Sequence, residues 1–294
     1  MKHIGNRTKE AALKRSNMGY ALVLIAALMW GTIGIFVNGI SALGVSSQSM
    51  AAFRLLSGAV LMAPVLVFMG CQGGAREGKA SGPMALFKTS PKALVPCALV
   101  GIVGLAVANT CYYECMGEVG MSTASVLLYT SPVFGVMLGR VLYREGVTPN
   151  KLVAIIFNIV GCVLAVTSGD LSGFHFSTWG VASGVIAGLC GALLAVFSRM
   201  ATKTLHPLAV TFWGFVFGGC FMAVLSAPWS DVAAAMSPQL ILLFAGFGFI
   251  PTALAYIFYM QGLSMDLETS KVPVVASFET VATVLVGIGI YAES

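Results

Sequence analysis

The sequence predicts an all-α integral membrane protein made of two inverted repeats of five helices each. Three observations lead to this fold class. Only 9% of the 294 residues are charged, whereas 58% are hydrophobic. Nine apolar runs are long enough to cross a bilayer. Residues 109–145 form two apolar helices joined by a short turn, and residues 254–293 repeat that pattern.

The composition excludes an ordinary soluble domain, in which about 25% of residues are charged. With a mean hydropathy of +0.92, most of the chain requires a bilayer as its solvent. The net charge of +5 does not indicate a nucleic-acid partner, because the positive residues lie in short segments between apolar runs. The seven cysteines show no CxxC or metal-like spacing, so the sequence predicts neither disulfides nor a metal site, and no cofactor.

The first predicted span follows a basic segment, residues 1–17, that is similar to the start of a signal peptide. Its apolar run is as long as the ~20 residues needed to cross a bilayer, and no small-x-small cleavage site follows it. We therefore interpret it as a retained transmembrane helix. The nine predicted spans are residues 18–40, 48–70, 93–117, 121–143, 150–167, 176–199, 207–226, 237–261 and 270–291.

The basic residues predict the orientation. With the N-terminus inside, the inner segments and the helix ends beside them hold every Lys and Arg except Arg54 and Lys271, and the outer segments hold none. Basic residues accumulate on the cytoplasmic side of membrane proteins. We therefore predict a multi-pass protein of the bacterial cytoplasmic (inner) membrane, with residues 1–17 in the cytoplasm.

The two halves align with each other. At an offset of 145 residues Gly117 falls on Gly262, and at 148 Glu145 falls on Glu293. An odd number of crossings in each repeat makes the second half inverted relative to the first, as in inverted-repeat transporters.

The first repeat is predicted over residues 18–167, with five helices, and the second over residues 176–294, with four. Only Ser294 follows Glu293, so the partner of the fifth helix is missing. A truncated sequence is expected in preference to a nine-helix variant.

Several short motifs recur in a fixed order. The run Ala26-Ala27-Leu28-Met29-Trp30-Gly31 follows Gly19, Arg54 lies in the second span, and a span with Ser131-Pro132 closes at Glu145. In this order they resemble the EamA-type branch of the drug/metabolite transporter superfamily. The resemblance implies ten helices in two inverted repeats, and export or exchange of small metabolites such as amino acids or amines through a central cavity. This chain has Glu279-Thr280 where the family usually carries an acid–Pro pair.

Two ionisable residues lie in the outer half of the predicted bilayer, Arg54 in the second span and Glu114 in the third. A charge at a helix centre costs at least ~2.5–3.5 kcal/mol on insertion scales, so each requires a physical reason. An Arg54–Glu114 ion pair, an arginine that extends to the interface, and a substrate contact are the alternatives.

Glu279 lies close to the predicted midplane, with no basic residue within one turn on its own helix. Repeat transporters bind substrates and coupling ions at this depth. Because burial without a cation favours the neutral carboxyl, Glu279 is the candidate group for proton coupling or amine recognition. A neutral, hydrogen-bonded structural role is the alternative.

Aromatic and amide side chains supply further candidates for a cavity lining, since buried Trp and Tyr need partners for their polar tips. A position in the interfacial aromatic belt is the alternative for each Trp or Tyr. Pro132 and Pro251 remove backbone hydrogen bonds within spans, which indicates kinks or unwound ligand sites. The predicted substrate-binding residues are Trp30, Arg54, Asn109, Tyr113, Glu114, Tyr129, Trp213 and Tyr256.

The sequence therefore predicts a secondary-active transporter, an exporter of a small metabolite by alternating access with coupling to protons. No nucleophile with a base and an orienting group is present, and no phosphate-binding G-x-x-x-x-G-K-[ST] loop, so an enzyme is not expected. An integral-membrane enzyme acting on a lipid-linked substrate and a non-functional truncated transporter are the alternatives. The expected partners are a small-molecule solute and the lipid bilayer, and the choice between monomer and homodimer stays open.

Overall fold

The computed structural model describes residues 2–77, 82, 84–143, 149, 153, 156–157, 160, 177–225, 229–263, 265, 275–276 and 278–291. All regular secondary structure in these residues is helical. Seven of the helices in these described residues are long and apolar enough to cross a membrane. The prediction of an all-helical integral membrane protein is thus confirmed within the described part of the chain.

The seven crossing helices match seven of the nine predicted spans. The ninth span, predicted over residues 270–291, is represented by a shorter apolar helix, Phe278–Ile290. Most of the fifth span, residues 150–167, lies outside the described residues, as do Glu145, Glu293 and Lys271.

The first, third and fourth crossings are built from shorter helical pieces, whereas the second is the single helix α3 (Ser47–Glu77). The first crossing breaks at Thr32, whose hydroxyl donates to the Met29 carbonyl at 2.7 Å, and such side-chain bonds to the preceding turn bend helices. The fourth crossing breaks just before Ser131-Pro132, where a proline is expected to interrupt a helix. The pieces are α1 (Lys2–Gly31), α2 (Ile33–Ser41), α4 (Pro91–Leu99), η1 (Val100–Val107), α5 (Ala108–Val119), α6 (Met121–Leu128) and α7 (Ser131–Tyr143).

The later crossings begin at clear capping signals. Ser177 accepts a hydrogen bond from the Gly180 N–H, and Ser237, followed by a proline, accepts one from the Leu240 N–H. Serine in this position satisfies an otherwise unpaired N–H of the first helical turn. The elements are α9 (Thr178–Ala201), α10 (Pro207–Leu225), α11 (Trp229–Ala234), α12 (Pro238–Gly248), η2 (Phe249–Leu254), α13 (Ala255–Leu263) and α15 (Phe278–Tyr291).

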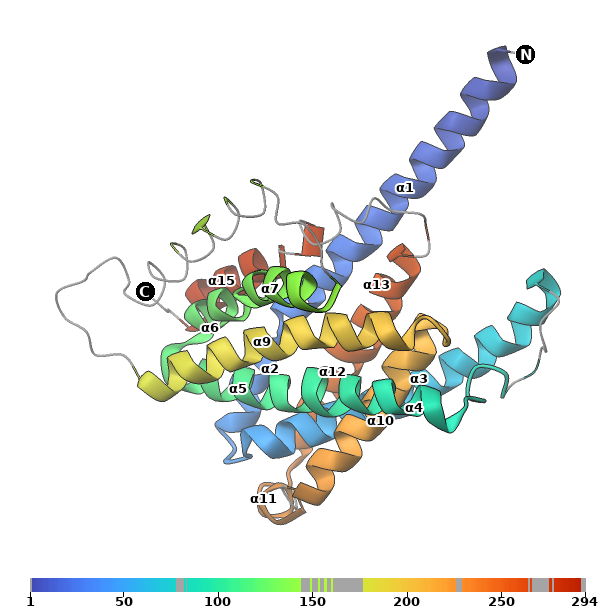
Figure 1. The fold of residues 1–294 in the computed structure, drawn as a ribbon. Helices are drawn as coiled ribbons and strands as arrows, with labels where there is room; N and C mark the ends of the chain where they lie inside the picture. The colour runs from blue at the N-terminus through green and yellow to red at the C-terminus, as the bar shows by residue number, and fades with distance from the viewer. Residues whose placement is uncertain are drawn as a thin grey trace.

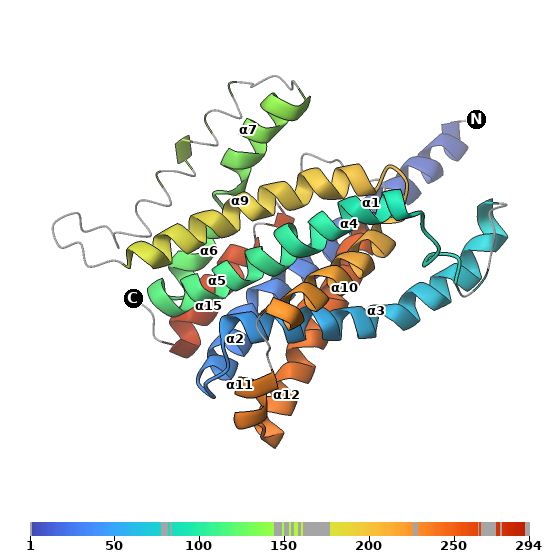
Figure 2. The same ribbon diagram turned by 60° about the horizontal axis from the view of Figure 1, so that its bottom comes forward.

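The helices of the two halves pack against each other reciprocally. Helix α9 lies along η1 and α5 and also contacts α6 and α7, whereas α1 contacts η2, α13 and α15 (Figure 1). Helix α3 packs against α10 and against α12–η2, and α10 packs in turn against α4–η1 (Figure 2). Each half therefore supplies the partners of the other.

Glycines permit the closest of these approaches. A Cβ at Gly101 in η1 would collide with the backbone oxygen of Gly214 in α10, and one at Gly218 would lie 2.5 Å from the Gly101 oxygen. Small residues let transmembrane backbones approach closely. A Cβ at Gly31 would likewise collide with Ala282 of α15, so α1 packs closely against the helix that carries Glu279.

An acidic residue outside the spans joins the connections of the two halves. The carboxylate of Asp231 in α11 accepts hydrogen bonds from the Ser46 N–H at 3.0 Å, the Ser46 hydroxyl at 2.8 Å and the Ser49 hydroxyl at 2.8 Å. It also accepts from the N–H of Val232 at 2.8 Å. Ser46 and Ser49 lie at the start of α3, where a carboxylate is favoured by the unpaired N–H groups and the helix dipole.

Asp231→Ala is expected to lower the free energy of unfolding by about 1 kcal/mol, the usual cost of a lost helix cap. For a chain of this size that corresponds to a fall in melting temperature of roughly 2–4 °C, measured on detergent-solubilised protein at neutral pH. Ser230→Ala, an exposed neighbour on the same short helix, is the control and is expected to melt like the wild type.

The difference in melting temperature between the wild type and Asp231→Ala should depend on pH. Burial alone raises the pKa of Asp231, but the hydrogen bonds from Ser46, Ser49 and Val232 outweigh burial and lower it below the ordinary 3.8. A lowered pKa stabilises the fold above the unfolded-state pKa, and that contribution is lost as pH falls through the folded-state value. The two melting temperatures should therefore begin to converge as the pH falls below about 4; a difference that does not change with pH would contradict this role.

Candidate functional site

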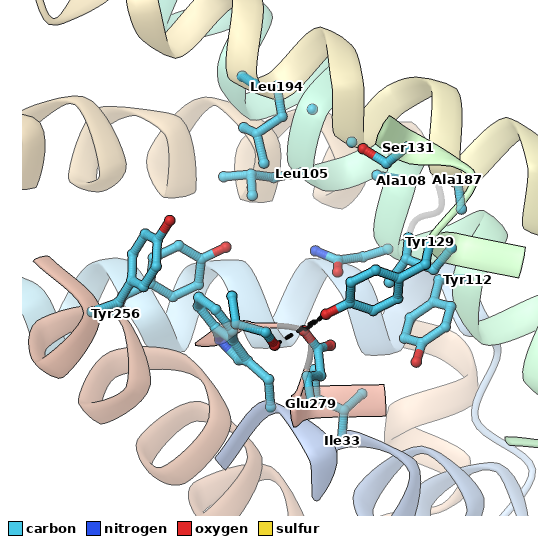
Figure 3. Close-up of a pocket in the computed structure, with 18 of the residues that line it drawn as sticks. Ile33, Leu105, Ala108, Tyr112, Tyr129, Ser131, Ala187, Leu194, Tyr256 and Glu279 are labelled. Carbon is cyan, nitrogen blue, oxygen red and sulfur yellow. Dashed lines mark hydrogen bonds between the residues drawn. The ribbon is translucent and has the colours of Figure 1, made fainter. Parts of the chain in front are cut away.

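A cavity of about 440 Å³ lies between the two halves, at the breaks in the crossing helices. Its walls come from α1, α3, η1–α5, α6–α7, α9, α13 and α15, and Figure 3 shows ten of the lining side chains labelled. The polar or aromatic side chains that line it are Trp30, Arg54, Asn109, Tyr112, Tyr129, Ser131, Tyr256, Tyr259 and Glu279.

Arg54 is the basic group of this cavity and is only 4% exposed. Its Nε donates to Thr252 Oγ1 at 3.0 Å, and its Nη1 donates to Asn109 Oδ1 at 2.9 Å and to the Tyr113 hydroxyl at 2.6 Å. Its Nη2 donates to the Pro251 carbonyl at 3.2 Å. Four of the five guanidinium N–H groups are therefore directed at protein oxygens.

The local backbone explains why Arg54 finds partners on α12–η2. Pro251 has no N–H and lies in the π-helical stretch η2, where the regular hydrogen-bond ladder is interrupted. Because Pro251 has no N–H for the Phe247 carbonyl four residues earlier, that carbonyl accepts instead from the Thr252 hydroxyl at 2.8 Å. The Pro251 carbonyl accepts from Arg54. The guanidinium carbon also lies 5.1 Å from the centre of the Phe247 ring, a cation–π distance.

Glu279 lies in the first turn of α15 and lines the same cavity. The Tyr129 hydroxyl lies 3.4 Å from Glu279 Oε2 and 3.1 Å from the Ala276 carbonyl (Figure 3). Tyr129 belongs to the break between α6 and α7, so the acid of the second half is contacted by an unwound segment of the first. The Thr283 hydroxyl donates to the Glu279 carbonyl at 2.9 Å and supports the same turn of α15.

An aromatic cluster, Trp30–Tyr256–Tyr259, forms one wall of the cavity. The ring centroids of Trp30 and Tyr256 are 5.3 Å apart, and those of Trp30 and Tyr259 are 5.2 Å apart, with interplanar angles of 69° and 54°. Tyr256 also packs edge-to-face on Phe215 at 5.2 Å. These are the separations and tilts that aromatic pairs prefer.

A second cavity of about 450 Å³ adjoins the first and shares the aromatic cluster with it. It extends along the C-terminal part of α9 to Ser198, Arg199 and Thr202, and to Pro207 at the start of α10. Trp30, Tyr256 and Tyr259 line both cavities, so they stand at the junction between the Glu279 region and that end of the bundle.

The structure brings together six of the nine predicted site residues: Trp30, Arg54, Asn109, Tyr129, Tyr256 and Glu279 all line the first cavity. Tyr113 is 1% exposed and lies behind the lining, where it supports Arg54. Trp213 does not belong to the lining of either cavity; it packs on the rings of Phe212 and Phe217, and its buried indole N–H has no partner among the described residues.

The suggested Arg54–Glu114 ion pair is wrong. Glu114 Oε2 accepts from the indole N–H of Trp179 at 3.1 Å on an exposed part of the surface, and the donors of Arg54 go to other oxygens. Depth in the bilayer places two residues at the same level, but their directions around the helix axes decide whether they meet. Glu114 therefore does not contribute to the cavity.

Several contributors to the site were not selected from the sequence, among them Tyr259 and Thr252. Tyr259 follows Tyr256 by three residues on one helix, a spacing that puts both on the same face. Thr252 follows Pro251 directly and reaches Arg54 because of the π-helical stretch. Only the first carries a sequence signal, the i, i+3 spacing. Among the described residues no group of three or more His, Cys, Asp or Glu side chains is arranged to hold a metal ion.

Comparisons with known proteins agree with this architecture. A family model described as the EamA-like transporter family matches residues 17–167 and again residues 178–294. The chain is 24% identical over 276 residues to an uncharacterized transporter of Archaeoglobus fulgidus, covering 94% of this chain and 88% of that protein. It is 25% identical over 248 residues to the uncharacterized inner membrane transporter YicL of Salmonella typhimurium, covering 84% and 79%.

The chain is also similar to one further transporter and to one solved structure. The uncharacterized transporter YyaM of Bacillus subtilis is 21% identical over 251 residues, covering 83% of this chain and 77% of that protein. A solved crystal structure with 18% identity covers 94% of this chain and 90% of its own, with a TM-score of 0.60; at that identity it supports the fold alone. Because the family model spans nearly the whole chain, this protein is a membrane transporter that belongs to the EamA-like transporter family of the drug/metabolite transporter superfamily.

Proposed function

We propose that this transporter is secondary-active and exports a small organic solute from the cytoplasm by alternating access, in exchange for protons at Glu279. The observation that carries the proposal is the cross-connection at the central cavity. Arg54 of the first half donates to Thr252 and Pro251 of the second half, and Glu279 of the second half is contacted by Tyr129 of the first. Any movement of one half relative to the other changes the surroundings of both ionisable groups.

The predicted inverted repeat supports a rocking movement of this kind. The contacts of α9 with η1, α5, α6 and α7 correspond to those of α1 with η2, α13 and α15. Adding the offset of 148 residues, which aligns Glu145 with Glu293, moves residues 100–107 of η1 onto residues 248–255, and η2 is Phe249–Leu254. The family model also matches the chain twice.

The two halves differ where alternating access would need asymmetry. Arg54 connects α3 to η2 through hydrogen bonds, whereas α10 meets η1 through direct contact of Gly214 and Gly218 with Gly101. At the offset of 160 residues, Gly214 is the counterpart of Arg54. One repeat thus has a charged side chain at a position where the other has a glycine.

The predicted orientation supports export from the cytoplasm. With the N-terminus inside, the second cavity, which ends at Ser198, Arg199 and Thr202, opens toward the cytoplasmic side. The connection between Asp231 and the start of α3 then lies on the outer side. The arrangement fits a transporter that accepts its solute from the cytoplasm of a bacterial cell.

The test is proton movement in vesicles that contain the purified chain and the pH-sensitive dye pyranine. At least one solute of a panel of choline, phenethylamine, putrescine, leucine and phenylalanine is expected to drive a protein-dependent pH change, because exchange of solute for protons links the two fluxes. Protein-free vesicles and vesicles treated with a protonophore are the controls. If every member of the panel leaves the internal pH unchanged, proton-coupled export is refuted.

A further inference from the structure

We propose that the aromatic cluster Trp30–Tyr256–Tyr259 is a binding site for a small organic cation, preferably a methylated ammonium, on the route between the inner opening and Glu279. The inference rests on the proposed function, because it names the class of solute that such a transporter would select. It is carried by the position of the cluster, its geometry and the charges that face it.

The cluster lies where the two cavities meet, on the path that a solute would take. Both cavities are lined by all three aromatic residues. The facing wall is apolar and comes from η1 and α9, with Leu105 and Leu194 in both linings, as Figure 3 shows opposite Tyr256. A solute that passes from the opening beside Arg199 toward Glu279 must pass between these two walls.

The geometry of the cluster suits a cation. The three rings are half-buried, and those of Tyr256 and Tyr259 are inclined to Trp30 at 69° and 54°, so their faces point in different directions. A cation within about 6 Å of such a face is attracted by the ring quadrupole, most strongly at Trp. The apolar opposite wall offers methyl groups a surface but gives ammonium N–H groups no acceptor, which favours a methylated nitrogen over a primary one.

The charges around the cluster also favour a cation. Glu279 lies at the deep end as the acid of the cavity lining. Arg54 also lines that cavity, but four of its N–H groups are directed at protein oxygens, so it has no bidentate fork to offer a carboxylate. Arg199 lies at the exposed opening, where water and salt screen its charge. A cation is thus attracted inward to Glu279 and stopped before Arg54.

The test uses three probes of nearly equal shape and the full chain in detergent. Choline carries the trimethylammonium group, dimethylbutanol replaces the nitrogen by carbon, and dimethylbutanoate carries a negative charge. Isothermal titration is expected to show choline binding at least roughly tenfold more tightly than dimethylbutanol, a ratio that corresponds to the stronger cation–π interactions. No binding of dimethylbutanoate is expected.

Substitutions assign the preference to the cluster. Trp30→Leu should reduce the ratio of choline to dimethylbutanol affinity to about one, and Trp30→Phe should leave an intermediate ratio, because the ring is smaller but still present. Trp179→Leu is the control, since that indole binds Glu114 away from the cavities. If Trp30→Leu does not fold, the three-probe comparison on the wild type decides alone.

The outcomes separate this inference from the proposed function. Equal affinity for choline and dimethylbutanol, tighter binding of dimethylbutanoate, or no heat with choline overturns the cation site. If a neutral or acidic solute nevertheless moves protons in vesicles, the export proposal stands without it. If choline binds selectively but no solute moves protons, the cation site stands and proton-coupled export falls.

Discussion

Glu279→Gln is expected to strongly reduce the exchange of solute for protons while leaving the protein folded. Glutamine has nearly the same shape as glutamate and can still accept a hydrogen bond from Tyr129, but it cannot take up or release a proton. The carboxyl is the acidic group in the cavity lining. We therefore expect proton-driven transport to fall at least about tenfold, a change that needs only ~1.4 kcal/mol.

The measurement is transport by wild type and variant in vesicles over a range of pH, together with exchange of solute in the absence of a pH gradient. The wild type should respond to pH, and the variant should not. Glu118→Gln, the same chemical change at an exposed position near the end of α5, should behave as the wild type. An unchanged rate and pH profile in Glu279→Gln would eliminate Glu279 as the coupling group.

Arg54→Met is expected to produce the largest loss of stability. The substitution leaves the oxygens of Thr252, Asn109, Tyr113 and Pro251 without their donor in a buried region. A buried acceptor left without its donor costs about 1–3 kcal/mol, and the substitution removes four such hydrogen bonds. The protein should therefore melt at a much lower temperature or fail to accumulate in the membrane.

Arg54→Lys should restore only part of this stability, because a lysine ammonium has three donors on a compact group and cannot reproduce the planar fork. Melting is followed by size-exclusion chromatography of heated, detergent-solubilised protein. The control is Arg140→Met, which removes an exposed arginine from the last turn of α7. An Arg54→Met variant that melts with the wild type would mean that Arg54 serves the solute alone, and that its protein contacts add nothing.

The sequence identified the two ionisable residues that line the cavity but not their partners. Arg54 and Glu279 were selected because ionisable groups are costly inside a bilayer, and both line the cavity. The sequence gives each residue a depth, which made Glu114 an apparent partner for Arg54. The true partners depend on the rotation of each helix about its axis, and on the bundle that places Asn109 and Thr252 around the guanidinium.

The breaks in the spans were predictable only where a proline caused them. Pro132 follows the interruption between α6 and α7, and Pro251 lies in η2. The stretch η1, Val100–Val107, contains no proline. Its Gly101 meets the backbone of Gly214 and Gly218, so this irregularity accompanies a close helix contact that no local pattern reveals.

By itself, the sequence determined that this chain is a multi-pass helical membrane protein, where most of its spans lie, and that Arg54 and Glu279 are ionisable residues placed deep within apolar segments. These properties follow from hydropathy and the cost of charge in lipid, which act residue by residue. Only the tertiary structure decided that Glu279 meets Tyr129, that Arg54 joins α3 to η2, and that Trp30 stands with Tyr256 and Tyr259 between two cavities. Such contacts depend on how helices far apart in the chain pack, and between apolar helices in lipid that packing is set by shape and polar pairing rather than by hydropathy.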